Sequence, residues 1–307
     1  YLLNTRPKKR KSKFMLNENK QVKGLVLTTI GVLAIVPDSI LIRLIQADIL
    51  TITFWRALIP GVIISLGVMI FYRKPTISFL KAPKMSGLIF IISHSFGTLF
   101  FVIAIELTSI ASALFIISTS PIFAAIISRI FLNEKITYRM IFTIFGALLG
   151  IGVISLGSIN SESIFAIGDI AALGAAMCLA ISLTAARSAS NFSMIPAVGV
   201  SSLLTSLCIF YFIEPFNLLY SDWVFILILG VIFVPIATCL IATGPRYITS
   251  AEVSLLLLLE ATLAPILAWF ILSEFPGFET ILGGVIVISV LVFSNIIALR
   301  QSKKIVQ

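Results

Sequence analysis

The feature that most constrains this chain is a series of apolar segments, each about 20 residues long and separated by short polar connections. A helix needs about 20 mainly apolar residues to cross the hydrocarbon core of a bilayer. Charged residues make up only 11% of the chain, against about a quarter in soluble domains. The sequence therefore predicts an all-α integral membrane protein. Ten transmembrane helices are expected, over residues 24–44, 51–71, 86–105, 110–131, 139–157, 166–187, 194–213, 222–242, 248–272 and 280–299.

The distribution of basic residues indicates how these helices are oriented. With a cytoplasmic N-terminus, the cytoplasmic segments hold 20 of the 22 Lys and Arg residues, and the outer loops hold none. Arg43 and Arg56 are the exceptions, and both lie at or within the outer ends of spans. Because an excess of Lys and Arg marks the cytoplasmic side, we expect a multi-pass protein of the cell inner membrane with cytoplasmic N- and C-termini. Residues 1–22 then form a basic cytoplasmic tail and residues 300–307 a second tail.

Several other classes of protein do not fit the sequence. The net charge of +9 arises largely from the basic run before the first span, which the positive-inside rule explains without a nucleic-acid partner. The chain has no G-x-x-x-x-G-K-[ST] phosphate-binding motif, and its three cysteines lie inside apolar segments without disulfide or metal-ligand spacing. With one histidine and no paired catalytic motif, we expect no enzyme activity, no cofactor and no metal.

An internal repeat relates the two halves of the chain. A shift of 140 residues places residues 104–111 over residues 244–251. Each half then has five spans, and an odd number of spans inverts the second half in the membrane. The predicted repeats cover residues 23–157 and 165–299. Inverted repeats that meet around a site at the membrane midplane are a recurring design of transporters, so the sequence predicts two inverted five-helix repeats around a central cavity.

Short motifs within these repeats are similar to those of a known family. The segments that carry the similarity are FWRA (54–57), AIELTSIASA (104–113), SPIFAA (120–125), FLNEK (131–135) and LLEATLAPILAW (258–269). In this order they resemble two copies of the EamA domain of the drug/metabolite transporter superfamily. FWRA is similar to the arginine-bearing second helix of that family, and the last segment is similar to its ninth helix. One difference is Ala261, where many members have a proline; here Pro265 follows one turn later.

The resemblance implies both a fold and a function. It implies ten helices in two inverted units around a central cavity, and transport of amino acids and related metabolites. We therefore expect a secondary transporter of small metabolites that works by alternating access, with a small-molecule substrate and the lipid bilayer as its partners. Quaternary amines, nucleotide-sugars and drugs are alternative substrates, and a non-transporting lipid-handling or structural membrane protein is the alternative from another class. Proton coupling and the choice between monomer and homodimer stay open.

Charged residues inside the predicted spans are the first candidates for a substrate site. A charged side chain at depth in a bilayer costs at least about 2.5–3.5 kcal/mol, so it requires a partner, water or a function. Asp38 in the first span and Arg56 in the second both lie roughly 10 Å from the outer ends, from the helical rise per residue. Two interpretations are open. The pair is a structural salt bridge, or Arg56 binds a substrate carboxylate while Asp38 binds an amine or a proton.

Four further residues complete the candidate substrate site. His94 lies near the middle of the third span and is either a packing residue or a proton-coupling group. Glu260 lies near the middle of a leucine-rich ninth span and is expected to face the cavity. Ser118 precedes Pro121 at an expected kink of the fourth span, and Trp269 lies near the outer interface, where a belt aromatic is the simpler explanation. The acidic and basic groups together suit a zwitterion such as an amino acid.

Small residues predict close helix packing in two spans. Gly146 and Gly150 of the fifth span form a GxxxG motif, which serves either packing within the bundle or a dimer interface. The sixth span is rich in Gly, Ala and Ser, and such residues allow helix backbones to approach closely. We therefore expect the sixth span to lie in the middle of the bundle rather than against lipid.

Overall fold

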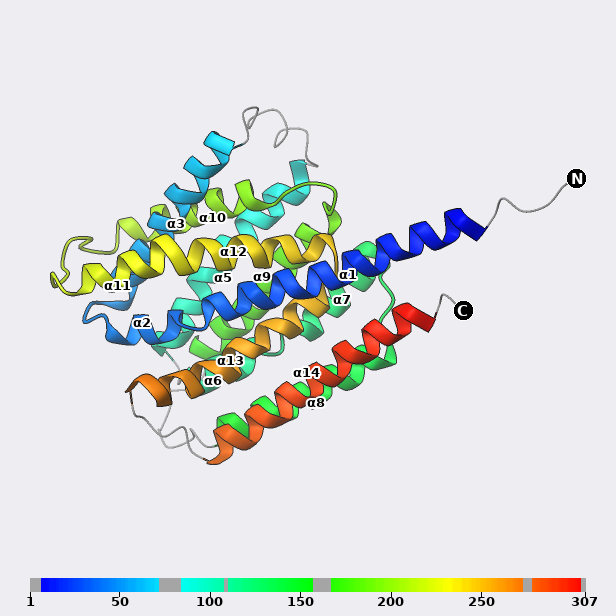
Figure 1. Cartoon of the computed structure of the whole chain (residues 1–307). Helices are drawn as coiled ribbons and strands as arrows, with labels where there is room; N and C mark the ends of the chain where they lie inside the picture. The colour runs from blue at the N-terminus through cyan, green and yellow to red at the C-terminus, as the bar shows by residue number, and fades with distance from the viewer. Residues whose placement is uncertain (1–6, 72–83, 108–109, 157–166, 273–277, 305–307) are drawn as a thin grey trace, which may run out of the picture.

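The computed structural model describes residues 7–71, 84–107, 110–156, 167–272 and 278–304. Within these residues every regular element is a helix and none is a strand (Figure 1). The helices are α1 (Pro7–Ile35), α2 (Asp38–Leu44), α3 (Ile49–Phe71), α5 (Lys84–Leu107), α6 (Ile110–Ile117), α7 (Ser120–Leu132), α8 (Tyr138–Leu156), α9 (Ile167–Ser188), α10 (Ile195–Phe210), α11 (Asp222–Ile228), the π-helical turn Leu229–Phe233, α12 (Val234–Thr243), the 3-10 turn Gly244–Arg246, α13 (Ser250–Leu272) and α14 (Phe278–Lys304).

Each of the ten predicted spans falls on one helix or on one broken helix, which confirms the all-α membrane fold. Of the described helices, six are long and apolar enough to cross a membrane, and three shorter apolar helices join them. α10 ends at Phe210, three residues before the predicted end of the seventh span at residue 213. The chain turns there, with the amide of Phe212 donating to the carbonyl of Ile209, and Pro215 follows, which cannot continue a helix.

Three of the ten spans are broken. α1 ends before Val36-Pro37, α6 ends before Ser118-Thr119, and α11 passes into α12 through the π-helical turn. The prolines at or just after these breaks are Pro37, Pro121 and Pro235. Proline has no N–H, and its ring clashes with the carbonyl four residues earlier, which accounts for the interruptions. The predicted kink near Ser118 is therefore a full break between two helices.

The contacts between helices follow the predicted repeat. Three spans pack against their own repeat mates: α3 against α10, α7 against α13, and α8 against α14. Other contacts are exchanged between repeat mates. α1 of the first span packs on α12 of the eighth, and their mates, α9 of the sixth span and α5 of the third, pack on each other in the same way. Contacts exchange in this way when one unit is related to the other by a two-fold axis, so the helices form two inverted five-helix repeats.

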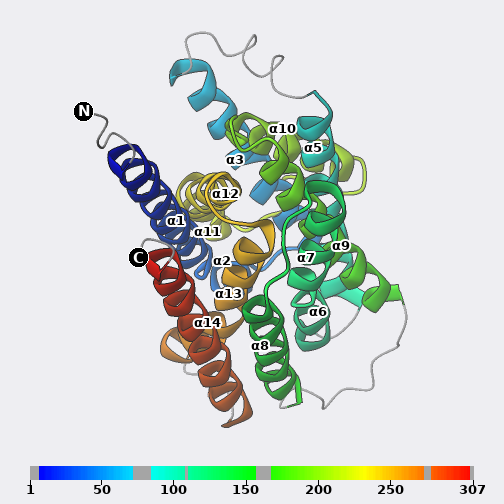
Figure 2. The same ribbon diagram turned by 90° about the vertical axis from the view of Figure 1, so that its right-hand side faces the viewer.

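Glycines allow the closest of these contacts, as the pair α8 and α14 shows. The two helices lie side by side at the edge of the bundle (Figure 2). A Cβ atom on Gly150 would lie 2.8 Å from the carbonyl oxygen of Gly283, and one on Gly146 would lie 2.9 Å from Val290. The GxxxG motif therefore serves packing within the bundle, which is the first of the two alternatives that the sequence left open.

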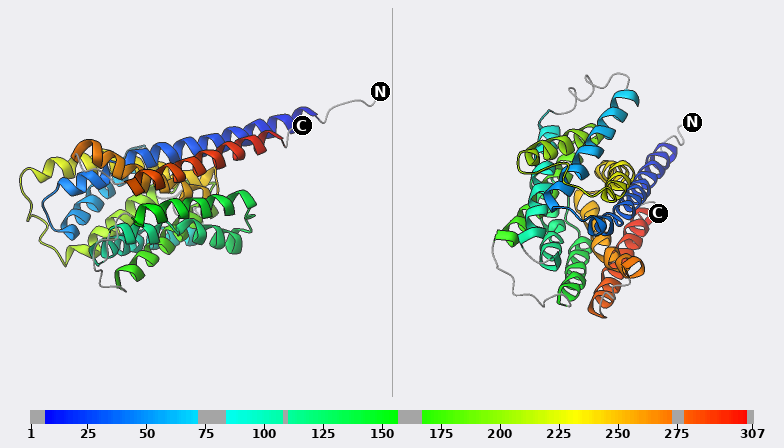
Figure 3. Two further views of the ribbon diagram at one scale, coloured as in Figure 1. Left: turned by 90° about the horizontal axis from the view of Figure 1, so that it is seen from below. Right: turned by 90° about the vertical axis from the view of Figure 1, so that its left-hand side faces the viewer.

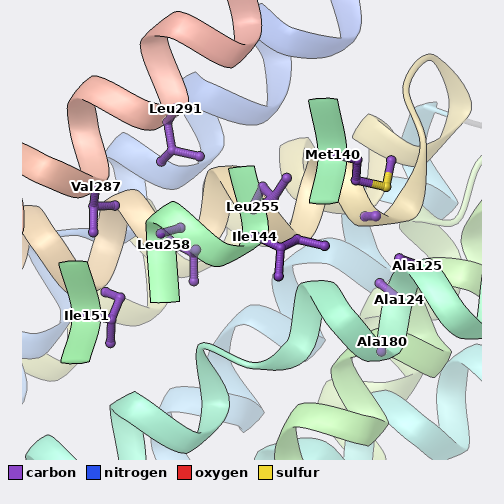
Figure 4. Packing of buried hydrophobic residues seen from close by; sticks show 12 residues of the cluster. Ala124, Ala125, Met140, Ile144, Ile151, Ala180, Leu255, Leu258, Val287 and Leu291 are labelled. Atoms are coloured by element: carbon purple, nitrogen blue, oxygen red, sulfur yellow. The ribbon is translucent and has the colours of Figure 1, made fainter. Parts of the chain in front are cut away.

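The core is built from side chains of both repeats. Figure 4 shows one cluster in which α7, α8, α9, α13 and α14 meet. Its labelled members are Ala124, Ala125, Met140, Ile144, Ile151, Ala180, Leu255, Leu258, Val287 and Leu291. The expectation for the sixth span is only half right. Ala172 and Ala176 of α9 are fully buried, but Ile170 on the same helix is 69% exposed and faces outward.

The two ends of the bundle differ in charge. α1 begins and α14 ends at the same end of the bundle (Figure 3). This end, here called the basic end, carries Arg129 in the last turn of α7, Arg139 in the first turn of α8, Arg187 in the last turn of α9 and Arg246 in the 3-10 turn before α13. The opposite end, called the acidic end, carries Asp48, Glu214, Asp222 and Glu279. The assignment of the basic end to the cytoplasm stays a prediction from the distribution of Lys and Arg.

Candidate functional site

The break in the first span determines the position of Asp38. After the turn at Val36-Pro37, Asp38 is the first residue of α2, and it is 4% exposed. A carboxylate at this end of a helix interacts favourably with the partial positive charge of the backbone N–H groups. Arg56 lies in α3, four residues before Pro60. Since Pro60 has no N–H, the carbonyl of Arg56 lacks its usual helical donor.

Asp38 and Arg56 form an ion pair in which the guanidinium contacts both carboxylate oxygens. Nε of Arg56 donates to Oδ1 at 2.9 Å and to Oδ2 at 3.1 Å, and Nη2 donates to Oδ2 at 2.6 Å. The Asp38 side chain is 6% exposed and that of Arg56 is 22% exposed. Nη1 makes no hydrogen bond to any residue that the structure describes. The first of the two interpretations, a salt bridge, is thus formed, and Arg56 still presents an unused donor edge.

Glu260 of α13 lies near this pair. It interacts electrostatically with both Asp38 and Arg56. Its carboxylate nevertheless makes no ion pair or hydrogen bond with any described residue, and the residue is only half-buried. Glu260 is ten residues from the start of α13, about 15 Å along the helix. The bundle therefore holds, at mid-depth, two carboxylates and one guanidinium, with one carboxylate lacking a direct partner.

His94 of α5 faces the same group of charges. It interacts electrostatically with Arg56, and its ring stacks on Phe90 with 5.5 Å between centroids. Nδ1 lies 3.3 Å from the hydroxyl of Ser201 on α10. That hydroxyl already donates to the carbonyl of Val198 at 2.9 Å, so it accepts from Nδ1–H. In the neutral form of the ring, this contact assigns the proton to Nδ1 and leaves Nε2 as an acceptor.

The structure gives less information on the other two predicted site residues, Ser118 and Trp269. Ser118 lies at the break between α6 and α7 and is 4% exposed. The neighbouring Ser120 joins this break to α13, since its hydroxyl lies 2.8 Å from that of Ser254. The side chain of Trp269 lies outside the part of the chain that the structure describes. The structure thus brings four predicted residues into one electrostatic group: Asp38, Arg56, His94 and Glu260.

Two ion pairs at the basic end were not identified from the sequence. Nη2 of Arg139 lies 2.6 Å from Oε1 of Glu252, and Nε of Arg187 lies 2.7 Å from Oε1 of Glu134. The sequence does contain one local motif that involves Glu252. Thr249 and Glu252 have the T-x-x-E spacing of a capping box, and in the structure Oε2 of Glu252 accepts from the amide of Thr249 at 3.1 Å. That spacing fixes the start of α13, but it gives no information on the arginine partner.

Both the sequence and the fold of this chain are similar to those of known proteins. The sequence profile of the EamA-like transporter family matches residues 22–156 and 166–296. No curated protein matches the chain. In all, 28 chains of solved structures match. One of them, a crystal structure described only as that of a protein, covers 91% of this chain and 99% of its own, with a TM-score of 0.77 and 16% identity. At this identity the likeness establishes the fold alone.

Proposed function

This chain belongs to the EamA-like transporter family, within the drug/metabolite transporter superfamily, and on that premise we propose that it carries amino acids or related zwitterions by alternating access. The observation that supports this substrate class is the carboxylate of Glu260, which has no ion-pair partner among the described residues, together with a guanidinium whose Nη1 has none either. A zwitterion has one charge for each of these groups. The proposed binding residues are those expected from the sequence: Asp38, Arg56, His94, Ser118, Glu260 and Trp269.

The binding step uses the free groups rather than the existing ion pair. The substrate carboxylate is bound by Nη1 of Arg56, whose guanidinium Asp38 holds in a fixed orientation. Arginine suits this task, because its planar fork can bind two carboxylates on different edges. The substrate ammonium is bound by Glu260. Each charge that is costly to keep at mid-depth then gains a counter-charge, so the occupied site is favoured over the empty one.

The location of the site suits alternating access. Asp38, Arg56 and His94 belong to the first repeat, whereas Glu260 and Ser201 belong to the second. A site at the interface between inverted repeats is exposed to one side or the other when one repeat rocks against its mate. The breaks at Val36-Pro37 and at the π-helical turn lie in helices that pack across this interface.

Two finer features belong to the same proposal. The basic end lies in the cytoplasm together with both termini, as the positive-inside rule predicts. Transport is coupled to protons through Glu260, which takes up a proton when no ammonium group occupies the site. A lone carboxylate at this depth is costly unless it is neutralised, and the proposed partner in proton transfer is His94, which interacts electrostatically with Arg56 of the same site.

Binding to the purified protein tests the substrate class. Amino acids are compared with two matched derivatives, the amine without its carboxylate and the N-acetyl compound without its ammonium group, by thermal unfolding in detergent. A ligand at 100 times its Kd stabilises the folded state by about 2.7 kcal/mol. We expect stabilisation by the amino acid and loss of it with both derivatives. Stabilisation by a quaternary amine, a nucleotide-sugar or a drug, with none from amino acids, would contradict the zwitterion assignment.

A further inference from the structure

We propose that the ion pairs Arg139–Glu252 and Arg187–Glu134 form a gate that closes the basic end of the bundle in the conformation seen here. The inference rests on the proposed function to the extent that a transporter must open and close its two ends. It adds four residues that lie away from the substrate site. When the protein opens toward the basic end, both pairs separate and their charged groups become hydrated.

Each ion pair joins one repeat to the other. Arg139 begins the fifth span, and its partner Glu252 lies in the first turn of α13, in the second repeat. Nη1 of Arg139 also donates to the carbonyl of Ser294 on α14 at 3.0 Å. The side chains of Arg139 and Glu252 are 14% and 12% exposed. One arginine of the first repeat thus holds two helices of the second.

In the second ion pair the arginine comes from the second repeat and the acid from the first. Arg187, in the last turn of α9 in the second repeat, contacts Glu134 of the first repeat at 2.7 Å. Nη1 of Arg187 donates to the carbonyl of Pro245 at 3.0 Å, in the connection between α12 and α13. Glu134 follows Asn133, whose φ of 53° ends α7 in a left-handed turn. This turn carries the carboxylate from the end of α7 toward α9.

The two pairs lie where a gate between the candidate site and the basic end would lie. Glu252 and Glu260 lie on the same helix, two turns apart, so the first pair lies about 12 Å from the candidate site toward the basic end. The acids belong to repeat mates, because Glu134 follows α7 and Glu252 begins α13. These two helices also touch deeper in the bundle, through the hydroxyls of Ser120 and Ser254. Separating the pairs frees both helices at this end.

The acidic end cannot form the same contact. Under the 140-residue shift, Arg139 corresponds to Glu279 and Glu252 corresponds to Ser112. An inverted copy of the first ion pair would therefore place a carboxylate opposite a hydroxyl. At the acidic end, the indole of Trp55 in the first repeat donates to the carbonyl of Pro215 in the second repeat at 2.7 Å. Under this shift the first ion pair therefore has no ionic equivalent at the acidic end.

Ion pairs at a water-facing end are suited to repeated opening. Breaking a pair by removing one partner leaves an uncompensated charge, but opening toward water hydrates both partners and costs far less. A cavity of about 10 Å³ already lies beside the first pair, lined by Arg139, Thr143, Glu252, Ser294 and Asn295 among others. Met140, Leu255, Leu256 and Leu291 complete the lining. The volume is about that of one water probe, so the space beside the pair is just large enough for one water molecule.

Cysteine accessibility tests the gate without any substrate. Ser254, fully buried beside Ser120, is replaced by Cys after Cys178, Cys208 and Cys239 have been changed to Ala. An impermeant maleimide is then applied to right-side-out and to inverted vesicles. In the double variant Glu134→Gln, Glu252→Gln we expect labelling from the basic-end side to rise at least tenfold. The matched control Glu279→Gln, an exposed acid at the other end, leaves the rate unchanged.

A charge reversal separates the gate from a loss of structure. Arg187→Glu with Glu134→Arg keeps an ion pair of opposite sense, and we expect labelling to return toward the rate of the Ser254→Cys parent, whereas Arg187→Glu alone labels fast. If the double glutamine variant does not fold, Glu134→Gln alone is judged by the same criterion. Unchanged labelling in a folded variant overturns the gate and leaves the proposed transport function standing. Failure of amino acids to bind would overturn the substrate class and leave the labelling result intact.

Discussion

Replacing Asp38 by Asn removes the anion that contacts Arg56, and the groups around the pair allow the cost to be worked out. In the wild-type protein the guanidinium donates to both carboxylate oxygens at 2.6–3.1 Å. The asparagine side chain keeps the shape and one acceptor oxygen but loses the charge. What remains is an arginine that is 22% exposed, with Glu260 as the nearby carboxylate that interacts with it electrostatically.

Replacing Arg56 should lower the free energy of unfolding more than replacing Asp38. Removing one partner of a buried pair typically costs about 3–5 kcal/mol, because the other charge is left uncompensated. For Asp38→Asn we expect a loss of about 2 kcal/mol in the free energy of unfolding, because Arg56 is partly exposed and can turn to Glu260. For Arg56→Gln we expect about 4 kcal/mol, because both Asp38 and Glu260 then lack a cation. The arginine variant should therefore be the less stable one.

A double-mutant cycle with Glu260→Gln measures this rescue. If Glu260 replaces Asp38 as the counter-ion, Asp38→Asn should cost about 1–2 kcal/mol more in the Glu260→Gln background than in the wild type. The assay is reversible unfolding of the purified protein in mixed micelles, followed at equal protein and detergent concentrations. Equal costs in the two backgrounds, or equal costs for Asp38→Asn and Arg56→Gln, would show that Glu260 does not share the electrostatic environment of the pair and would refute the reasoning.

Three further predictions concern the substrate site, helix packing and topology. Glu260→Gln should abolish or strongly reduce flux into liposomes while the thermal stability stays near wild type, and flux at the wild-type rate across pH would make Glu260 a packing residue. Gly150→Ala should lower the free energy of unfolding by about 1–3 kcal/mol, because its Cβ would meet a backbone oxygen of α14 at 2.8 Å, whereas Gly152→Ala, with 3.7 Å to its nearest neighbour, should be neutral or stabilising by chemical denaturation. A cysteine in place of exposed Tyr220 should be labelled from outside the cell and one in place of exposed Asn191 should not; the reverse pattern would invert the predicted topology.

Part of the candidate site could be found from the sequence because a charge inside an apolar span is conspicuous. Asp38, Arg56, His94 and Glu260 were identified by depth alone, since each is costly in a bilayer unless it has a partner or a function. Depth does not tell which of two charges contact each other. The sequence left Asp38 and Arg56 between a salt bridge and separate substrate contacts. Only the packing of both α2 and α3 against α11 and the π-helical turn brings Nη2 to 2.6 Å from Oδ2.

The ion pairs at the basic end escaped sequence reasoning for a related reason. Arg139, Arg187, Glu134 and Glu252 all lie at helix ends, where charged residues are common and where a solvated role is the default reading. Their partners are separated by 113 residues in one pair and 53 in the other. Neither separation corresponds to a local spacing that a helix or a turn would bring together.

The sequence by itself determined the features that each segment shows without reference to the others. Hydropathy fixes which stretches can enter a bilayer, Pro121 marks an interruption of the fourth span, and the shift of 140 residues makes the two halves equivalent. These effects depend on one segment and its solvent, or on a comparison of segments, so they can be read before any contact is known. The ten spans and the two inverted repeats were predicted for this reason.

Only the tertiary structure decided which side chains meet. It placed the GxxxG face of α8 on α14 rather than on a second protomer, it left one face of α9 exposed, and it closed the basic end with two ion pairs between the repeats. The physical reason is that helix association inside a bilayer gains little from apolar burial and depends on close packing and specific polar contacts. Such contacts are set by the rotation and crossing of whole helices, which no single segment of the sequence specifies.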